Sequence, residues 1–321
     1  MEFIFGYIFI GVVFGAIGAK TISMLASKID LIDYPGPRSS HFHPIPKAGG
    51  IGIALSVFFL CFTEKMPTAF CLPVLLIIVL GFLSDRYKIL PKYRFIIQSV
   101  VAVFFVYYHN TFNEHGLWIS IFFILFIVAT TNFFNFMDGI NGLAAMTGVI
   151  AFGLLALFSS IILKNHQVFL TSLILTASCA GFLPFNFPRA KVFMGDVGSI
   201  FLGFVFAVSV IKLSFSINIF LCLVMFLCVF YSDAVLTIYY RWRKGENLFK
   251  AHRQHLYQYM CNELGLPHWK VTLLYAGVQI IFGFSAIFMY NRGVKWQIAL
   301  FLVFVAVFSF SYRYIKNFNP K

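Results

Sequence analysis

Long apolar segments recur along the whole chain, and they constrain its fold more than any other feature. We place eleven of them near residues 3–24, 48–63, 69–84, 95–109, 117–134, 140–162, 168–184, 198–212, 217–240, 271–290 and 296–312. Apolar runs of roughly 17–25 residues can cross a bilayer as helices. Lipid requires every backbone polar group to be satisfied within a helix or a closed barrel, and these runs lack the period-two alternation of barrel strands. The sequence therefore predicts an all-α polytopic membrane protein with 10–11 transmembrane helices, since some short runs could merge or be re-entrant.

Composition and domain organisation agree with this prediction. Only 11% of the 321 residues are charged, whereas soluble domains carry about 25%. No internal repeat, low-complexity tract or shift in composition divides the chain, so we expect residues 1–321 to form a single membrane-embedded domain. The six cysteines form no C-x-x-C pair and lie mostly within apolar runs, which favours packing over metal binding.

The distribution of basic residues explains the net charge of +13. If the N-terminus lies outside, most lysines and arginines fall in cytoplasmic loops and the C-terminal tail, as the positive-inside rule predicts. We therefore expect the N-terminus out, the C-terminus in and no nucleic-acid partner. The first span lacks a basic leader and a small-residue cleavage pattern, so it is predicted to be an uncleaved anchor.

Acidic residues are scarce, and four aspartates lie in or beside an apolar run. These are Asp85, Asp138, Asp196 and Asp233. A charge at mid-bilayer costs about 2.5–3.5 kcal/mol on the insertion scale, so such residues are functional candidates. For Asp233, pairing with Arg241 eight residues later is an equally weighted structural alternative.

The segment FNFPRAKVFMGDVGS (185–199) places Asp196 between two glycines just before a new span. Mg²⁺ takes one or two carboxylates and leaves its other positions to water and substrate phosphate. A carboxylate here, with a second one nearby, suits that ion. A helix beginning at this point would also favour a phosphate at its N-terminus.

Two further polar segments lie on the same predicted side of the membrane. DYPGPRSSHFHPIPKAGG (33–50) is rich in Pro and Gly, so we expect an irregular loop carrying Arg38, His41 and Lys47. KAHRQHLYQ (250–258) places His252 and His255 three apart on one helical turn, and contacts to phosphate are favoured over zinc. Carboxylates, amides, histidines and basic residues on one face are typical of magnesium-dependent phosphoryl transfer.

Five motifs in order carry a resemblance to a known family. They are D-x-P-x-x-R-x-x-H-x-x-P-x-P-x-x-G-G (33–50), the acidic span end (81–85), N-x-x-N-x-x-D-G (132–139), N-x-x-P…V-F-M-G-D-x-G-S (186–199) and A-H-R-x-H-L-Y-Q (251–258). From about Asp33 to Gln258 the chain resembles the polyprenyl-phosphate N-acetylhexosamine-1-phosphate transferases, and its last motif resembles those that start lipopolysaccharide O-chains.

The resemblance implies a reaction, a location and a cofactor. A sugar 1-phosphate, from N-acetylhexosamine or a related sugar, would pass from a UDP-sugar to undecaprenyl phosphate. UMP would be released and a lipid-linked surface polysaccharide begun. The site would lie on the cytoplasmic face of the bacterial inner membrane and use Mg²⁺, with Mn²⁺ as an alternative. A homodimer is left open.

The resemblance also implies roles for individual residues. Asp85, Asp138 and Asp196 would be catalytic, with Asp196 the metal ligand. Asn186, Phe193, Asn135 and Asn132 would serve the nucleotide: Asn186 on the uridine, Phe193 stacked on the uracil, and Asn132 in support. Lys88, Arg94, Arg38, His41, His252 and His255 would contact phosphate or sugar.

One departure from the family pattern leaves three readings open. Two adjacent aspartates usually follow the third span, and this chain has Ser84 and Asp85. Asp85 could suffice; a base could be dispensable, because a phosphate monoester with a second pKa of about 6 is already ionised; or the chain could be inactive. A transporter or flippase is the other alternative, but it predicts polar residues through the midplane and at both faces.

Overall fold

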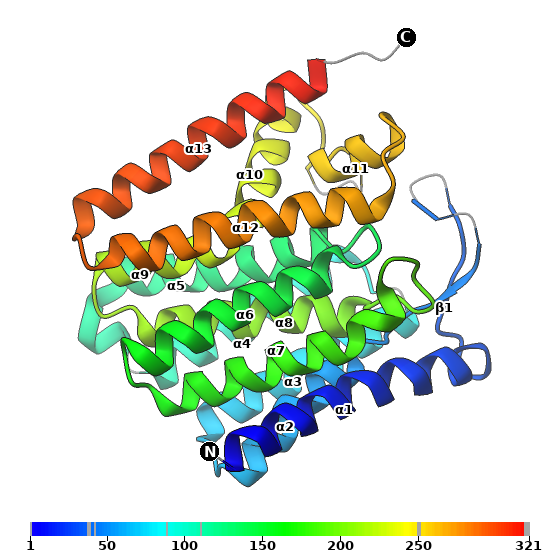
Figure 1. Cartoon of the computed structure of the whole chain (residues 1–321). Coiled ribbons are helices and arrows are strands. Elements are labelled where there is room, and N and C mark those ends of the chain that lie inside the picture. Colours follow the sequence, from blue (N-terminus) through cyan, green and yellow to red (C-terminus); the bar gives the residue numbers. More distant parts are fainter. Residues whose placement is uncertain are drawn as a thin grey trace.

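The computed structural model describes residues 2–36, 40–41, 43–87, 89–109, 111–248 and 252–317, without the side chains of 2–3 and 111–115. Long helices lie side by side, and β1 and α11 lie at one end of the bundle (Figure 1). The helices are α1 (Glu2–Leu25), α2 (Ile51–Thr63), α3 (Thr68–Tyr87), α4 (Pro91–Tyr108), α5 (Thr111–Phe136), α6 (Leu143–Ile161), α7 (His166–Asn186), α8 (Asp196–Leu213), α9 (Ile217–Val224), α10 (Cys228–Arg243), α11 (Leu256–Asn262), α12 (His268–Tyr290) and α13 (Val294–Asn317). Short 3₁₀ turns lie at Ala26–Lys28 (η1) and Met225–Leu227 (η2).

Nine helical segments in the described part of the chain are long and apolar enough to cross a membrane. They include one continuous run, Ile217–Arg243, whereas α2 is apolar but short. Each of the eleven predicted segments coincides with a helix or, for 217–240, with α9, η2 and α10 together. The prediction of an all-α polytopic membrane protein is therefore confirmed.

A side chain from α12 replaces part of the backbone hydrogen bonding where α9 gives way to α10. Gln279 Nε2 donates to the carbonyl of Met225 at 2.9 Å, and its Oε1 accepts from the N–H of Val229 at 3.3 Å. A break in a helix within lipid is tolerated where a neighbouring helix satisfies the freed groups. This contact lets the chain change direction between α9 and α10 (Figure 1).

Glycines bring α1 and α7 into close backbone contact. A Cβ on Gly15 would lie 2.0 Å from the carbonyl oxygen of Ser178, and one on Gly181 would lie 2.2 Å from that of Val12. Small residues let membrane helices approach in this way. In contrast α8 runs through the centre of the bundle, packed against α2, α3, α5, α6 and α9, and is almost entirely buried.

The loop expected to be irregular contains a short antiparallel ladder. Strand β1 (Ile32–Asp33) pairs with β2 (Ile45–Pro46). The N–H of Phe193 then donates to Pro46 O at 2.8 Å, and the N–H of Gly49 donates to Phe193 O at 2.9 Å. Because of these bonds, the loop packs directly behind the segment that leads into α8.

Candidate active site

A cavity of about 620 Å³ opens at the end of the bundle where α3 and α5 finish and α8 begins. Residues of the 33–47 loop, α4 and α11 complete its wall. The lining includes His41, Lys47, Ser84, Asp85, Arg94, Asn135, Asp138, Phe193, Asp196 and Gln258. All three aspartates predicted to be catalytic therefore border one space.

Asp85 caps the first turn of α8. Its two carboxylate oxygens accept hydrogen bonds from the backbone N–H groups of Asp196 and Val197, each at 3.0 Å, and the side chain is buried. A carboxylate satisfies the unpaired donors of a helix N-terminus and is stabilised by the helix dipole. These N–H groups, which we expected to favour a phosphate, are therefore occupied by the protein itself.

Gly195 makes this close arrangement possible. Its backbone has φ +75° and ψ 172°, a region open essentially only to glycine. A Cβ at this position would lie 2.6 Å from Asp85 Oδ2 and 2.6 Å from the backbone nitrogen of Ala48. The G-D-x-G-S sequence thus begins with a glycine for both steric and conformational reasons.

Asp138 lies in the turn between α5 and α6, beside the other two carboxylates. Burial, followed by the nearby charges of Asp196 and Asp85, raises the pKa of Asp138 well above its ordinary value, although a hydrogen bond from the N–H of Gly195 opposes the shift. Like charges close together disfavour ionisation of both. This carboxyl group therefore keeps its proton to a higher pH than an exposed aspartate does.

Asp196 is held by two side chains from neighbouring helices. Ser84 Oγ donates to Asp196 Oδ2 at 2.6 Å, and the guanidinium of Arg94 forms an ion pair with the same oxygen. Arg94 Nη1 also lies 3.4 Å from Ser84 Oγ. The hydroxyl at the departure from the family pattern therefore contacts the predicted metal ligand directly.

Asn135, Phe193 and His41 border the same cavity. Asn135 Oδ1 accepts a 2.7 Å hydrogen bond from Ser199 Oγ, which joins the end of α5 to the first turn of α8. The rings of Phe193 and His41 meet edge to face at 5.0 Å. Within the described part of the chain, His41 Nε2 is buried and has no hydrogen-bond partner, and it lies 3.8 Å from Asp33 Oδ2.

Two amides of the predicted site do not line the cavity. Asn132 Nδ2 donates to Gln98 Oε1 and to Val128 O, each at 2.7 Å, in keeping with a supporting position. Asn186 is 3% exposed, accepts from the N–H of Gly142 at 2.8 Å and donates to Val192 O at 2.9 Å. Asn186 thus ties the start of α6 to the segment before α8. Arg38 and Lys88 lie outside the described residues.

The two histidines of the last motif lie beyond the cavity and do not share a helical turn. His252 precedes α11 in a non-helical segment and His255 is its N-cap, with the ring centroids 5.0 Å apart. His255 Nδ1 lies 3.4 Å from Asp233 Oδ1, and the His255 side chain is buried. Burial lowers the pKa of His252 to about 4, so its ring is neutral at pH 7.

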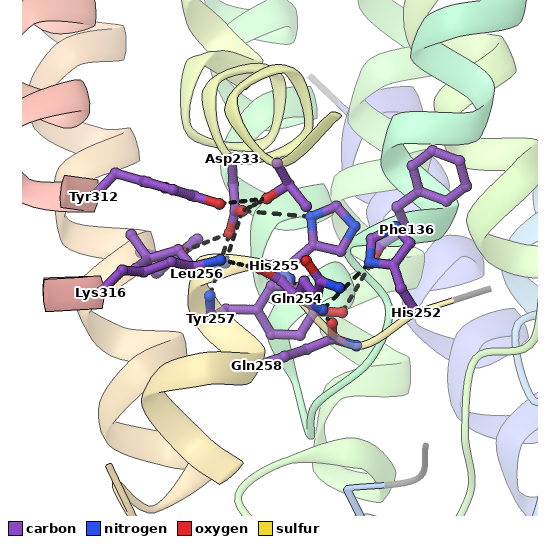
Figure 2. Close-up of polar contacts among 12 residues, drawn as sticks. Phe136, Asp233, His252, Gln254, His255, Leu256, Tyr257, Gln258, Tyr312 and Lys316 are labelled. Carbon is purple, nitrogen blue, oxygen red and sulfur yellow. Dashed lines mark hydrogen bonds and ion pairs between the residues drawn. The ribbon is translucent and has the colours of Figure 1, made fainter. Parts of the chain in front are cut away.

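Asp233 anchors α11 (Figure 2). Among the ion pairs of the described residues, Asp233 pairs with His255 and not with Arg241. Its carboxylate accepts from the N–H groups of Leu256 at 2.8 Å and Tyr257 at 3.3 Å, and from Tyr275 OH at 2.7 Å. Arg241 instead contacts Glu246 Oε2 at 2.9 Å. A buried carboxylate requires such partners, and these partners come from two different helices.

The network continues from Asp233 to the cavity through residues the motif analysis did not single out. Tyr257 OH donates to Phe136 O at 2.8 Å, directly before the turn that carries Asp138. The next residue, Gln258, lines the cavity, and its Oε1 accepts from the N–H of His255 at 3.3 Å. The only sequence signal for Gln258 was its place at the end of the last motif.

The donor set fits a divalent cation only if other molecules supply most of the ligands. Among the residues the structure describes, no cluster of three Asp, Glu, His or Cys side chains is arranged to hold a metal. Asp85 is committed to the N–H groups of α8, and Asp196 faces the cavity with Arg94 beside it. One available carboxylate with a second nearby matches Mg²⁺ held largely by water and substrate phosphate.

The fold and the site together define a polytopic membrane protein with a carboxylate-rich cavity at one end of its helices. Residues 67–214 match the model of glycosyl transferase family 4. A Bacillus subtilis (strain 168) protein named “Probable undecaprenyl-phosphate N-acetylglucosaminyl 1-phosphate transferase” is 31% identical over 307 residues, covering 89% of this chain and 84% of that protein. The undecaprenyl-phosphate alpha-N-acetylglucosaminyl 1-phosphate transferase of Thermotoga maritima is 28% identical over 307 residues, with 94% of each chain covered.

A third relative has a different lipid in its name. The decaprenyl-phosphate N-acetylglucosaminephosphotransferase of Mycobacterium leprae is 29% identical over 319 residues, covering 84% of this chain and 80% of that protein. The chain belongs to the polyprenyl-phosphate N-acetylhexosamine-1-phosphate transferase family. Sugar-phosphate transfer to a polyprenyl phosphate is accordingly its class of reaction.

Proposed function

We propose that this protein transfers an N-acetylhexosamine 1-phosphate, or a related sugar 1-phosphate, from a UDP-sugar to undecaprenyl phosphate and releases UMP. The reaction would take place at the cytoplasmic face of the bacterial inner membrane and start a lipid-linked surface polysaccharide. The observation that carries the proposal is the pairing of Asp196 with Ser84 and Arg94 in a cavity shared with Asp85 and Asp138.

The proposed reaction depends on neutralising the charges of the reactants more than on a covalent intermediate with the protein. An oxygen of the lipid phosphate bonds to the β-phosphorus of the UDP-sugar while the bond from that phosphorus to UMP breaks, so UMP leaves with the electron pair. Both reactants are anionic, and positioning with charge neutralisation supplies most of the catalysis in phosphoryl transfer. Arg94 and Lys47 are the cationic side chains that line the described cavity.

Mg²⁺ is proposed as the cofactor, with Asp196 as its protein ligand and Asp138 as the nearest further carboxylate. When bound, such an ion neutralises phosphate charge and stabilises the departing UMP. Asp85 keeps the first turn of α8 in place, so that Asp196 faces the cavity. The lipid phosphate is already largely dianionic near neutral pH, and direct displacement therefore needs no strong base.

The structure bears on the two alternative hypotheses. Three of the four aspartates in or beside spans border one cavity, and the fourth, Asp233, lies in the network next to it. This grouping favours a transferase over a transporter, which needs polar groups along a path across the membrane. Ser84 makes a hydrogen bond to Asp196, and this contact favours an active site adapted to serine over an inactive one.

The test uses the full chain purified in nanodiscs with undecaprenyl phosphate and Mg²⁺. A panel of UDP-sugars is supplied one at a time, and UMP and lipid-linked product are quantified by mass spectrometry. We expect equal amounts of UMP and lipid-diphosphate product with at least one UDP-N-acetylhexosamine. Absence of UMP with every sugar, from protein that melts cooperatively, would support the inactive alternative.

A further inference from the structure

A second and larger cavity, of about 1440 Å³, lies beyond α11. The C-terminal end of α10, the described residues 244, 246–247 and 252–254, and the last turns of α13 border it. It shares no lining residue with the candidate active site: Gln258 of α11 faces the first cavity and its neighbour Tyr259 faces the second. The two spaces are therefore separate sites on either side of one short helix.

The lining of this second cavity is strongly cationic. Six basic side chains border it: Arg241, Arg243, Lys244, Arg253, Arg313 and Lys316. The two carboxylates in the lining already lie against arginines, Glu246 at 2.9 Å from Arg241 and Glu263 at 4.0 Å from Arg253. Six cations against two carboxylates leave an excess of four positive charges, since His252 is neutral at pH 7.

Aromatic rings hold several of these cations in place. Tyr240 and Tyr312 stack with centroids 5.4 Å apart, which joins α10 to α13. Arg313 Nε donates to Tyr240 OH at 2.7 Å, and Lys316 Nζ lies 4.6 Å from the centre of the Tyr312 ring (Figure 2). A cationic wall whose side chains are already ordered loses less conformational entropy when it binds an anion.

The position of the second cavity, at the ends of membrane-spanning helices, indicates that it lies near the lipid headgroups. It is bounded by the ends of two membrane-spanning segments, α10 and α13. Two exposed aromatic residues are sequence neighbours of lining residues: Trp242, 67% accessible, follows Arg241, and Tyr314, 65% accessible, follows Arg313. Tyr and Trp at helix ends mark the headgroup region, and the outer surface of α13 is largely unburied within the protein.

We propose that this second cavity binds the phosphate headgroup of an anionic membrane lipid, with a two-phosphate headgroup such as that of cardiolipin as the best match. Basic pockets between transmembrane helices bind lipid phosphates of this kind. The volume exceeds the roughly 300–1,000 Å³ of ordinary small-molecule sites, so it accommodates a bulky headgroup. The excess of four positive charges offsets two phosphates.

The experiment measures lipid binding to the full-length, delipidated protein by native mass spectrometry, with cardiolipin and phosphatidylcholine as probes. Arg243→Gln/Lys244→Gln removes two cations of the lining, and Arg243 lies over the ring of Tyr239 on its own helix. We expect cardiolipin affinity to fall roughly 25-fold, about fivefold per cation. Arg313→Gln provides a third, independent substitution in the same wall.

Arg292→Gln/Lys295→Gln is the matched control. It removes one arginine and one lysine where α12 meets α13, and Arg292 lies over Phe288 much as Arg243 lies over Tyr239. Cardiolipin affinity should stay within about twofold of the native value. Equal loss in the control, or none in Arg243→Gln/Lys244→Gln, would overturn the proposal.

Two further arms separate the source of the phosphate and the role of the site. Inorganic pyrophosphate that displaces cardiolipin at comparable concentration would show that the cavity reads soluble anions and would overturn the lipid assignment. Turnover without added cardiolipin should be unchanged in Arg243→Gln/Lys244→Gln, because neither residue borders the active-site cavity. A loss of turnover with cardiolipin binding intact would instead assign these cations to the transfer reaction. The binding readout does not depend on the proposed function.

Discussion

The hydroxyl of Ser84 donates a 2.6 Å hydrogen bond to the carboxylate of Asp196. The site consequently has one fewer negative charge than two adjacent aspartates would give, and a neutral hydroxyl contacts the predicted metal ligand. Arg94 pairs with the same carboxylate oxygen. The carboxylate of Asp196 therefore has two partners, the neutral hydroxyl of Ser84 and the positively charged guanidinium of Arg94.

The first prediction concerns the charge at position 84. Ser84→Asp should lower the Mg²⁺ concentration for half-maximal turnover by roughly 30-fold, since a second carboxylate about 4 Å from a divalent cation adds about 2 kcal/mol of attraction in water-like surroundings. The Mg²⁺ concentration for half-maximal turnover is measured by following UMP release as Mg²⁺ is titrated. Ser84→Asn, similar in size and uncharged, is the control; the same midpoint for both variants would contradict the charge argument.

The second prediction concerns Asp196 itself. Asp196→Asn should reduce turnover by roughly 10²–10³-fold, the scale typical for removal of one electrostatic group at a reacting phosphate or oxyanion. Asp30→Asn serves as the control because Asp30 is exposed and does not line the cavity. Undiminished, magnesium-dependent turnover in Asp196→Asn would remove this residue from the metal site.

The third prediction follows from the raised pKa of Asp138. Between the unfolded pKa of about 3.9 and the higher folded value, the native state binds more protons than the unfolded state. Stability should therefore fall as pH rises through that interval, and Asp138→Asn should reduce the slope. Melting temperatures recorded from pH 5 upward test this. An identical slope in Asp138→Asn would show that another group titrates.

The fourth prediction concerns Gly195. Gly195→Ala should destabilise the protein and abolish turnover, because its Cβ would lie 2.6 Å from Asp85 Oδ2 in addition to the strain of φ +75°. Gly265→Ala measures the cost of the positive φ alone, since Gly265 has φ +69° with open space around it. This substitution should lower the free energy of unfolding by about 1 kcal/mol. Equal melting temperatures for the two variants would argue against a steric role for Gly195.

The fifth prediction concerns the network behind α11. Asp233→Ala should cost about 3–5 kcal/mol, since removing one partner leaves buried donors unsatisfied. Turnover should fall too, because Leu256 and Tyr257 bond to Asp233 and position Gln258 at the cavity. Asp233→Asn, which keeps two acceptor lone pairs, should lose less. Native-like melting of Asp233→Ala would show that the network is dispensable.

Much of the fold could be predicted because lipid reduces the choice of backbone structure, and apolar length then locates the spans. The gap between α5 and α6 was also predictable, since Gly139 and Gly142 interrupt the pattern and Gly142 has φ +79°. The break between α9 and α10 was not, because Met225 and Val229 carry no breaking signal of their own. It depends on Gln279, some 50 residues away.

The sequence predicted some of the residues that line the cavity, but not the contacts that they make. The motifs identified Asp85, Asp138 and Asp196, and all three line one cavity. The capping of α8 by Asp85 and the burial of His255 against Asp233 depend on how separate helices dock. Sequence separation conceals such relationships, and a buried carboxylate has no local signature that distinguishes a structural cap from a catalytic group.

Because α8 is buried within the protein, the depth of the candidate active site in the membrane should depend little on the thickness of the bilayer. In its apolar window 89% of residues are buried within the protein, against 11% for α13. Tilting or stretching in response to hydrophobic mismatch acts on helices that touch lipid. Outer helices such as α13 absorb that mismatch, and the depth of Asp196 is set by the surrounding protein. Enzymatic rate should therefore vary little among membranes of different acyl-chain length.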